Sequence, residues 1–343
     1  MQLKPINEQV VVVCGASSGI GREAALRFGR QGAKVVVSAR SEPGLRSLVD
    51  EIRAEGGEAT AIPADVSDFD QVRAIADGAV QQYGRLDTWV HAAAVLLYAT
   101  FEDTTPEEFE RVVDVNLMGQ VYGAMAALPH LKREGRGALI HISSIEARRA
   151  LPYHSAYAAA KHGIDGFLEA MRVELRKEGV PVSVTQILPA TINTPLFSKA
   201  RTKIGVKPMG APPFYPPGSV ADAILYAAEH PRRDIVVGGV GKQLVTTQRL
   251  SPRLMDEILL RVGFRLQRTN EPKSADAPDN LFAPIQGYDR SEGDFGKLSF
   301  RRSLYTWLQR HPTLKATAML GAAAGAAAII DGRTSATTRT KEQ

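Results

Sequence analysis

Tyr157 and Lys161 are the residues whose types and spacing point most directly to chemistry. They stand four positions apart in a segment that we expect to be helical, so their side chains share one face of that helix. An unperturbed tyrosine titrates near pH ~10, and a neighbouring ammonium lowers that pKa. Such a phenol can donate a proton to a forming alkoxide, or accept one in reverse. Ser144, at the end of a predicted strand thirteen residues earlier, could hydrogen-bond the same substrate oxygen.

A glycine-rich turn near the N-terminus is a second candidate site. An apolar strand leads into the residues C-G-A-S-S-G-I-G, and a helix follows. Glycines let the backbone approach a pyrophosphate closely, and the helix offers its unpaired N–H groups to the anion. A second strand about 20 residues later completes a dinucleotide-binding unit, whereas a purely structural turn is the alternative. The predicted cofactor contacts here are Gly15, Ser17, Ser18, Gly19, Ile20 and Gly21.

The end of the second strand bears on the choice of cofactor. An acidic residue at this place binds the ribose hydroxyls of NAD, whereas a basic residue accommodates the 2′-phosphate of NADP. The strand ends in Ser38-Ala39-Arg40-Ser41, with one arginine and no acid. The planar fork of a guanidinium suits a phosphate. We therefore expect NADP(H) rather than NAD(H), the alternative being that Arg40 is a solvated surface residue.

These residues are positioned by alternating predicted strands and helices. Apolar strands are expected at 10–13, 35–38, 59–62, 86–91, 138–142, 182–187 and 235–237. The longest helices are expected over 105–133, with a bend near Gly119, and over 156–177. Continuous apolar strands separated by helices indicate a parallel sheet covered on both faces. The predicted fold is α/β, a doubly wound Rossmann sheet of about seven strands, with the proline-rich loop 194–217 as a candidate substrate lid.

The ordered set of motifs resembles the short-chain dehydrogenase/reductase family over about residues 8–240. The matching pieces are G-A-S-S-G-I-G at 15–21, A-D-V at 64–66, V-N-L at 115–117, I-S-S at 142–144, Y-A-A-A-K at 157–161 and L-P-A-T-I-N-T at 188–194. Each piece alone is weak, but their order and spacing together are specific. Two pieces depart from the family pattern, because His91-Ala92-Ala93-Ala94 replaces Asn-Asn-Ala-Gly and Pro189-Ala190 replaces Pro-Gly.

The resemblance implies a role for each matching residue. Tyr157 would be the general acid/base, Lys161 would lower its pKa and hold the nicotinamide ribose, and Ser144 would orient the substrate oxygen. Asn116 would bend its helix and hold a water in a proton relay with Lys161. Hydride would pass directly between nicotinamide and carbon, so no metal is implied. The other implied cofactor contacts are Asp65 and Val66 at the adenine, Ile192 and Thr194 at the carboxamide, and Ala92 and Pro189.

Charge and composition divide the chain into two parts. Lys+Arg and Asp+Glu number 27 each in residues 1–244, and they number 15 and 10 in residues 245–343, which sum to the totals of 42 and 37. A neutral body with a basic tail does not resemble a nucleic-acid-binding protein. We expect a catalytic domain over 1–244 and an extension over 245–343, with a helix over 253–266 and an irregular linker at about 269–297. The single cysteine, Cys14, and the absence of a signal-like N-terminus suggest the cytoplasm.

The end of the extension has its own pattern. Basic residues interleave with apolar ones over 297–315, and an alanine-rich apolar stretch covers about 314–330. As a helix, the stretch is shorter than a bilayer's ~30 Å core. Association with a membrane surface is one interpretation. Packing against the body or a second subunit is the other.

These observations favour an oxidoreductase that interconverts a secondary alcohol and a carbonyl. Apolar residues at 95–98 suggest a lipophilic substrate, such as a steroid, a retinoid-like molecule or an acyl chain, and His154 could line its pocket. A non-catalytic NADP(H)-binding regulatory or scaffold protein is the main alternative, and a nucleotide-sugar epimerase or dehydratase is another. The resemblance also implies a homodimer or homotetramer that pairs through the two longest helices.

Overall fold

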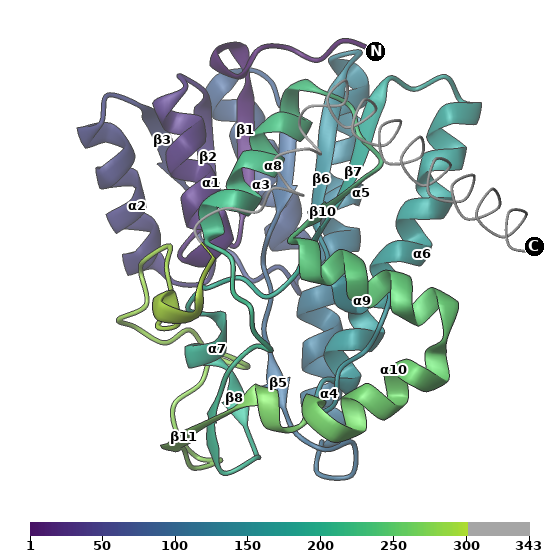
Figure 1. Cartoon of the computed structure of the whole chain (residues 1–343). Coiled ribbons are helices and arrows are strands. Elements are labelled where there is room, and N and C mark those ends of the chain that lie inside the picture. Colours follow the sequence, from purple (N-terminus) through teal and green to yellow (C-terminus); the bar gives the residue numbers. More distant parts are fainter. Residues whose placement is uncertain (301–343) are drawn as a thin grey trace, which may run out of the picture. The chain divides into compact units, whose positions relative to one another are not determined.

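A parallel sheet of seven strands lies at the centre of the computed structural model, which describes residues 1–300 (Figure 1). The strand order is β10-β7-β6-β4-β1-β2-β3. The chain thus runs outward from β1 to β3 and returns to β4 on the other side of β1, and ligands of such sheets bind at this switch point. The seven strands are β1 (Val10–Cys14), β2 (Lys34–Ser38), β3 (Glu58–Ala61), β4 (Thr88–His91), β6 (Gly137–Ile142), β7 (Val182–Pro189) and β10 (Asp234–Val237).

Helices cover both faces of the sheet, as the doubly wound prediction requires (Figure 1). Helices α1 (Gly19–Arg30), α2 (Glu42–Ala54) and α8 (Pro217–Glu229) pack on one face. The other face is covered by α3 (Phe69–Tyr83), α4 (Pro106–Val113), α5 (Gly119–Arg133) and α6 (Ser155–Lys177). The predicted fold class is therefore confirmed.

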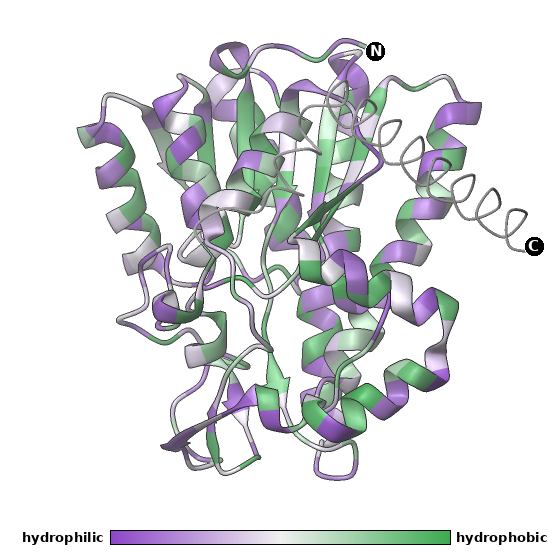
Figure 2. Ribbon diagram, viewed as in Figure 1, coloured by the Kyte–Doolittle hydropathy of each residue, from purple (hydrophilic) through white to green (hydrophobic). Residues whose placement is uncertain are grey.

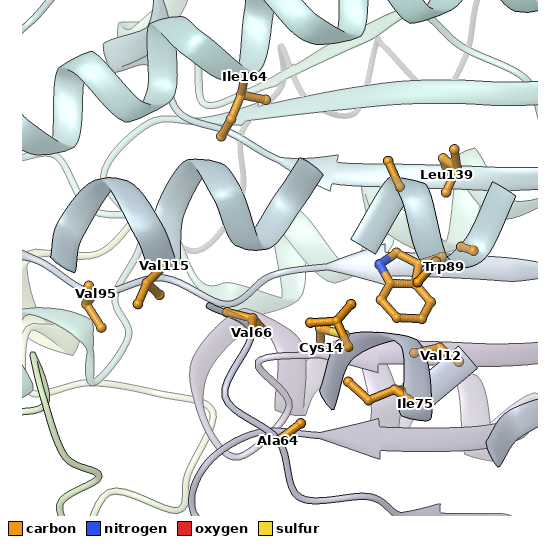
Figure 3. Packing of buried hydrophobic residues seen from close by; sticks show 14 of the residues in the cluster. Val12, Cys14, Ala64, Val66, Ile75, Trp89, Val95, Val115, Leu139 and Ile164 are labelled. Atoms are coloured by element: carbon orange, nitrogen blue, oxygen red, sulfur yellow. The ribbon is translucent and has the colours of Figure 1, made fainter. Parts of the chain in front are cut away.

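The two hydrophobic cores meet at strands that are buried along their whole length. In β1, Val12 and Cys14 face one core whereas Val11 and Val13 face the other. Figure 3 shows Val12 and Cys14 packed with Trp89 and Ile75 beneath the sheet. The apolar colouring of the central strands in Figure 2 follows from the same arrangement, because a strand covered on both faces has no polar side.

Local signals explain where the helices begin and bend. Asp68 caps α3, because its side chain accepts a hydrogen bond from the backbone N–H of Gln71. Thr105 and Glu108 form a reciprocal capping box at the start of α4. Between α4 and α5 the chain forms a π-helical turn over Asp114–Met118. A π-helical turn thus interrupts the helix directly before Gly119, where a bend was predicted.

The second half of the chain departs from the predicted division. A helix that the sequence pattern did not reveal, α9 (Gly239–Leu250), runs through the boundary expected at 244/245. The described residues on the two sides of this position belong to one compact unit. The helix expected over 253–266 forms as α10 (Pro252–Ile258), followed by a π-helical turn over Leu259–Gly263. Within the described part of the chain, no helix is long and apolar enough to span a membrane.

Shorter elements build the rim above the carboxyl edge of the sheet. The loop 194–217 contains the short helix α7 (Leu196–Lys199) and two short strands, β8 (Arg201–Thr202), which pairs with β5 (Leu97–Tyr98), and β9 (Val206–Pro208). Strand β11 (Arg268–Pro272) pairs antiparallel with β9. The loop predicted at 194–217 is thus present, and it contains two short strands that were not predicted. The predicted alanine-rich helix at 314–330 and the basic stretch beyond 300 lie outside the described residues.

Candidate active site

One continuous cavity at the carboxyl edge of the sheet brings most of the predicted site residues together. Its lining includes Gly15, Ser17, Ser18, Gly19, Ile20, Arg40, Asp65, Val66, Ala92, Ser144, Tyr157, Lys161, Pro189, Ile192 and Thr194. Gly21 and Asn116 are the two predicted residues that do not line it. The cavity therefore joins the predicted phosphate cradle to the predicted proton-transfer group, as hydride transfer between a dinucleotide and a substrate requires.

The glycine turn depends on the absence of side chains. Gly15 has a φ of 81°, and a Cβ there would overlap the backbone nitrogen of Ala93. A Cβ on Gly21 would overlap the carbonyl oxygen of Gly15, which explains why this residue is needed although it does not line the cavity. Helix α1 begins at Gly19, so its N-terminus faces the cavity. The turn thus has the form of an anion cradle.

Arg40 lines the cavity just beyond the end of β2, and it is not a solvated surface residue. Its guanidinium donates hydrogen bonds to the carbonyl oxygens of Asn280 at 2.5 Å, Phe282 at 3.1 Å and Leu281 at 3.4 Å. Its Nη1 also lies 3.9 Å from a carboxylate oxygen of Asp65. Burial lowers the pKa of Arg40, although a guanidinium remains charged at neutral pH. The fork is therefore held in place from one side by backbone acceptors.

Lys199 is a cationic residue of this site that the sequence analysis missed. Its Nζ donates a hydrogen bond to Ser18 Oγ at 2.7 Å, directly at the glycine turn. Burial and, to a smaller extent, the nearby charge of Arg40 lower the pKa of Lys199 to about 8, against an opposing effect of the Asp289 carboxylate. A buried ammonium beside a phosphate cradle is placed to neutralise a pyrophosphate. It lies in α7, and no local motif marks it.

The proton-transfer group forms at the start of α6. Tyr157 is almost fully buried, and it shares a hydrogen bond with Ser144, whose Oγ also accepts from the backbone N–H of Glu146 at 3.1 Å. Burial raises the pKa of Tyr157, the charge of Glu146 raises it further, and the hydrogen bond with Ser144 lowers it. The net shift of the Tyr157 pKa is thus upward, so the lowering that we expected from Lys161 is not found. The phenol therefore keeps its proton at neutral pH and is a proton donor.

Lys161 lies below Tyr157 on the same helix face, as predicted. Its Nζ is 5.3 Å from the centroid of the Tyr157 ring and donates to the carbonyl oxygen of Ile142 at 3.0 Å. Burial lowers the pKa of Lys161 to about 7. Asn116 lies in the π-helical turn, and its side-chain amide pairs with both the N–H and the carbonyl of Val95 at 2.8 and 2.9 Å. Asn116 thus anchors the strand-to-loop junction beside the cavity.

A buried carboxylate and an imidazole complete the substrate end. Nδ1 of His154 lies 3.0 and 3.1 Å from the two carboxylate oxygens of Glu146. Both residues line the cavity, and the His154 ring makes an edge contact with the ring of Tyr157 at a centroid distance of 5.9 Å. The expected place of His154 in the pocket lining is confirmed. Glu146, two residues after Ser144, was not predicted.

The segment 279–295, named the strap here, lies within the linker expected at about 269–297. Its backbone is irregular, as predicted, and it packs over the cavity, whereas the start of the expected linker forms β11. The backbone N–H of Gly19, at the start of α1, donates to the carbonyl of Arg290 in the strap at 2.9 Å. The strap residues that line the cavity are Asn280, Pro284, Ile285, Tyr288 and Asp289. In Figure 1 the segment is drawn in yellow-green beside α2 and α7.

Comparison with known proteins gives the same family as the motifs. A family model described as short chain dehydrogenase matches residues 9–205. The chain belongs to the short-chain dehydrogenase family. It is 38% identical over 331 residues to the uncharacterized oxidoreductase YxnA of Bacillus subtilis, which covers 96% of this chain and 92% of that protein.

Two further relatives place the chain among enzymes. The trihydroxynaphthalene reductase PfmaI of Pestalotiopsis fici is 37% identical over 55% of this chain and 66% of its own length. A short-chain dehydrogenase/reductase from Mycobacterium marinum has a similar solved structure, with a TM-score of 0.60, 29% identity and coverage of 68% of this chain and 96% of its own. The protein is therefore an NAD(P)-dependent oxidoreductase that acts on a CH–OH group or its carbonyl in a small-molecule substrate.

Lys199 provides a first test of the cofactor end. We expect Lys199→Met to weaken the binding of NADPH and NADH about tenfold, because a charged partner of the pyrophosphate is lost. Only the ammonium form attracts phosphate, and the free protein loses that form as the pH rises through about 8. The wild-type affinity should therefore fall between pH 7 and pH 9 in calorimetry, and the variant's should not. Lys203→Met, which removes a lysine bonded to Glu108 outside the cavity, is the matched control. A pH slope unchanged by Lys199→Met would contradict the assignment.

Proposed function

We propose that this protein is an NADP(H)-dependent oxidoreductase that interconverts a lipophilic secondary alcohol and its carbonyl, with Tyr157 as the general acid/base. The observation that carries the proposal is the single cavity that runs from Arg40 and Lys199 at one end to Ser144, Tyr157 and Lys161 at the other. One end is cationic and matches a phosphorylated nucleotide. The other end is a buried phenol with a neighbouring ammonium and hydroxyl.

The residues present fit a nicotinamide dinucleotide. The glycine turn, with Ser18 and Lys199, would hold the pyrophosphate, because the N-terminus of α1 and an ammonium meet there. The N–H of Gly19 donates to the carbonyl of Arg290 in the strap, so it is not counted among these donors. Arg40 would hold the 2′-phosphate. Asp65 and Val66 would contact the adenine, Ile192 and Thr194 the carboxamide, and Ala92 and Pro189 the neighbouring cofactor surface, since all of these line the cavity. When bound, the nicotinamide supplies or accepts the hydride.

The side chains around Tyr157 could carry out the proton transfer to the substrate oxygen. Ser144 and Tyr157 would hold the substrate oxygen between two hydroxyl groups, which places its carbon for reaction and stabilises negative charge on the oxygen. Tyr157 would donate its phenolic proton to that oxygen during reduction. Lys161, whose ammonium lies near the ring, would stabilise the phenolate that remains. Asn116 would support the relay that returns a proton to Tyr157. Its side chain bonds to Val95, which lines the cavity.

The lining of the substrate end supports a lipophilic substrate. Val95, Leu96, Leu151, Leu196 and Phe197 line it alongside Ser144 and Tyr157. A mostly apolar pocket with a few convergent polar groups suits a hydrophobic molecule that carries one reacting oxygen. The relative from Pestalotiopsis fici acts, by its name, on trihydroxynaphthalene, which has a fused-ring carbon skeleton. We propose a cyclic or polycyclic carbonyl compound as the substrate class.

Arg40 tests the cofactor preference. We expect NADPH to bind more tightly than NADH, and Arg40→Ala to weaken NADPH binding about 10–100-fold with little effect on NADH, because hydrogen bonds to charged groups contribute about 1.5–3 kcal/mol. Calorimetry with both nucleotides on both proteins measures this difference. Arg46→Ala, which removes an exposed arginine paired with Glu42, is the control. Equal affinities for NADPH and NADH in the wild type would overturn the preference.

We also propose self-association through the layer formed by α4, α5 and α6. Met125 on α5 and Val173 on α6 are large apolar side chains with 56% and 68% of their surfaces exposed. Two exposed hydrophobic residues on neighbouring helices favour an isologous dimer. Sedimentation of the wild type against a Met125→Glu/Val173→Glu variant tests it, and a wild-type monomer would contradict it.

A further inference from the structure

The strap occupies a place that links it to the nucleotide rather than to the substrate. Its residues Asn280, Tyr288 and Asp289 line the same cavity as Arg40 and Ser17. The substrate end, at Tyr157 and Ser144, is lined by other segments. The strap therefore borders the half of the cavity that receives the adenosine phosphate.

Contacts of the strap fall on groups that a dinucleotide needs. Its backbone carbonyls hold the Arg40 guanidinium at Asn280, Leu281 and Phe282, and the carbonyl of Arg290 accepts from the N–H of Gly19. The strap backbone also donates a hydrogen bond, from the N–H of Asn280 to the carbonyl of Lys199 at 3.0 Å. The strap thus contacts three residues of the predicted phosphate site, Arg40, Gly19 and Lys199.

A polar group of the strap is left for a ligand. Asn280 is 7% exposed, and its side-chain oxygen is buried with no hydrogen-bond partner among residues 1–300. A buried amide without a partner is costly. Because Asn280 lines the cavity beside Arg40, a ribose hydroxyl or an adenine amino group would satisfy it.

Two carboxylates of the strap, Asp279 and Asp294, anchor it near its ends, and the partners of both belong to the loop 194–217. At one end Asp279 accepts from Arg201 Nε at 2.8 Å. At the other end Asp294 accepts from Ser198 Oγ at 2.6 Å and lies 3.2 Å from Lys207 Nζ. Between these anchors the strap contains few buried side chains and little regular structure. Such a segment opens more easily than the sheet that it covers.

We propose that the strap is a wall of the nucleotide site that contacts the adenosine end of the bound cofactor through Asn280 and opens when the nucleotide leaves. This inference rests on the proposed function. The strap is held by the Asp279 and Asp294 anchors, and it in turn holds Arg40. Release of the nucleotide then requires the anchors to break, so the strap slows nucleotide exchange.

The test measures NADPH dissociation by stopped-flow fluorescence, with excess NADP⁺ as the displacing nucleotide. Asp279→Asn/Asp294→Asn removes the charge of both anchors, which weakens their bonds to Arg201 and Lys207, and should raise the dissociation rate about tenfold or more. The control Asp276→Asn/Glu292→Gln removes two negative charges at exposed positions without touching an anchor, and it should stay within about twofold of the wild type. Equal dissociation rates for the two double variants would overturn the strap proposal. A wild type that binds neither NADPH nor NADH would instead overturn the proposed function.

Proteolysis of the unaltered protein gives a second readout. Trypsin cleaves after arginine, and the carbonyl of Arg290 in the strap accepts the hydrogen bond from the N–H of Gly19. Saturating NADPH should slow this cleavage about tenfold or more, because the occupied cavity favours the closed strap. Cleavage at the same rate with and without bound NADPH would contradict the proposal even if both double variants failed to fold.

Discussion

Tyr157→Phe should lower kcat about 10³-fold for any carbonyl substrate that the wild type reduces, while NADPH binding changes less than about threefold. The variant keeps the buried ring and the packing against His154 but removes the only proton that Tyr157 can give to the substrate oxygen. Steady-state kinetics with NADPH oxidation, together with calorimetry, measures the two quantities separately.

Tyr83→Phe is the matched control for this loss. This variant also loses a hydrogen-bonded hydroxyl, because the Tyr83 oxygen lies 3.0 Å from Thr60 Oγ1. Tyr83 is on α3, however, and does not line the cavity. It should leave kcat within about twofold of the wild type. If Tyr157→Phe retained more than a tenth of the wild-type kcat, another group would have to be the general acid.

Lys161→Met should have the second largest effects. It should lower the activity and raise the stability of the folded protein. We expect kcat/KM to fall about 10²–10³-fold, because the charge that stabilises the phenolate of Tyr157 is lost. We expect the free energy of unfolding at pH 7 to rise on the order of 3 kcal/mol, because the folded protein no longer buries an ammonium. Kinetics and urea unfolding measure the two changes.

The pH dependence of that stability follows from the shifted pKa. Burial lowers the pKa of Lys161 to about 7 in the folded protein, against ~10.4 in an unfolded chain. Between these values the unfolded chain binds more protons at this site, so wild-type stability should rise from pH 7 towards pH 10. The stability difference between Lys161→Met and the wild type should therefore shrink over this range. A difference that stays constant with pH would show that the burial of charge is not its cause.

The sequence predicted the parts of the site that depend on short stretches of chain. The glycine turn, Arg40 and the Tyr157–Lys161 pair each lie within one strand–turn–helix unit, where spacing determines which side chains share a face. Ser144 was placed by its position at a strand end. The seven strands were also predicted, because buried parallel strands have continuous apolar runs.

The missed features depend on contacts between distant segments or on backbone groups. Lys199 reaches Ser18 across 181 positions in the chain. The strap binds Arg40 through backbone carbonyls, which every residue type has, so no residue pattern could reveal the contact. Helix α9 was missed because two glycines and several β-branched residues weaken its helical pattern. The contacts of Lys199 and of the strap thus form only when the fold brings distant segments together.

Transfer of deuterium from the reduced nicotinamide of NADPH to a carbonyl compound is the most direct test of the central claim. The wild type is incubated with NADPH deuterated at the reactive nicotinamide carbon and a panel of cyclic and polycyclic ketones, and the products are examined by mass spectrometry. We predict an alcohol that carries one deuterium on the former carbonyl carbon, formed by the wild type and not by Tyr157→Phe. NADPH binding with no deuterated alcohol from any ketone of the panel would contradict the account and favour a cofactor-binding protein without turnover.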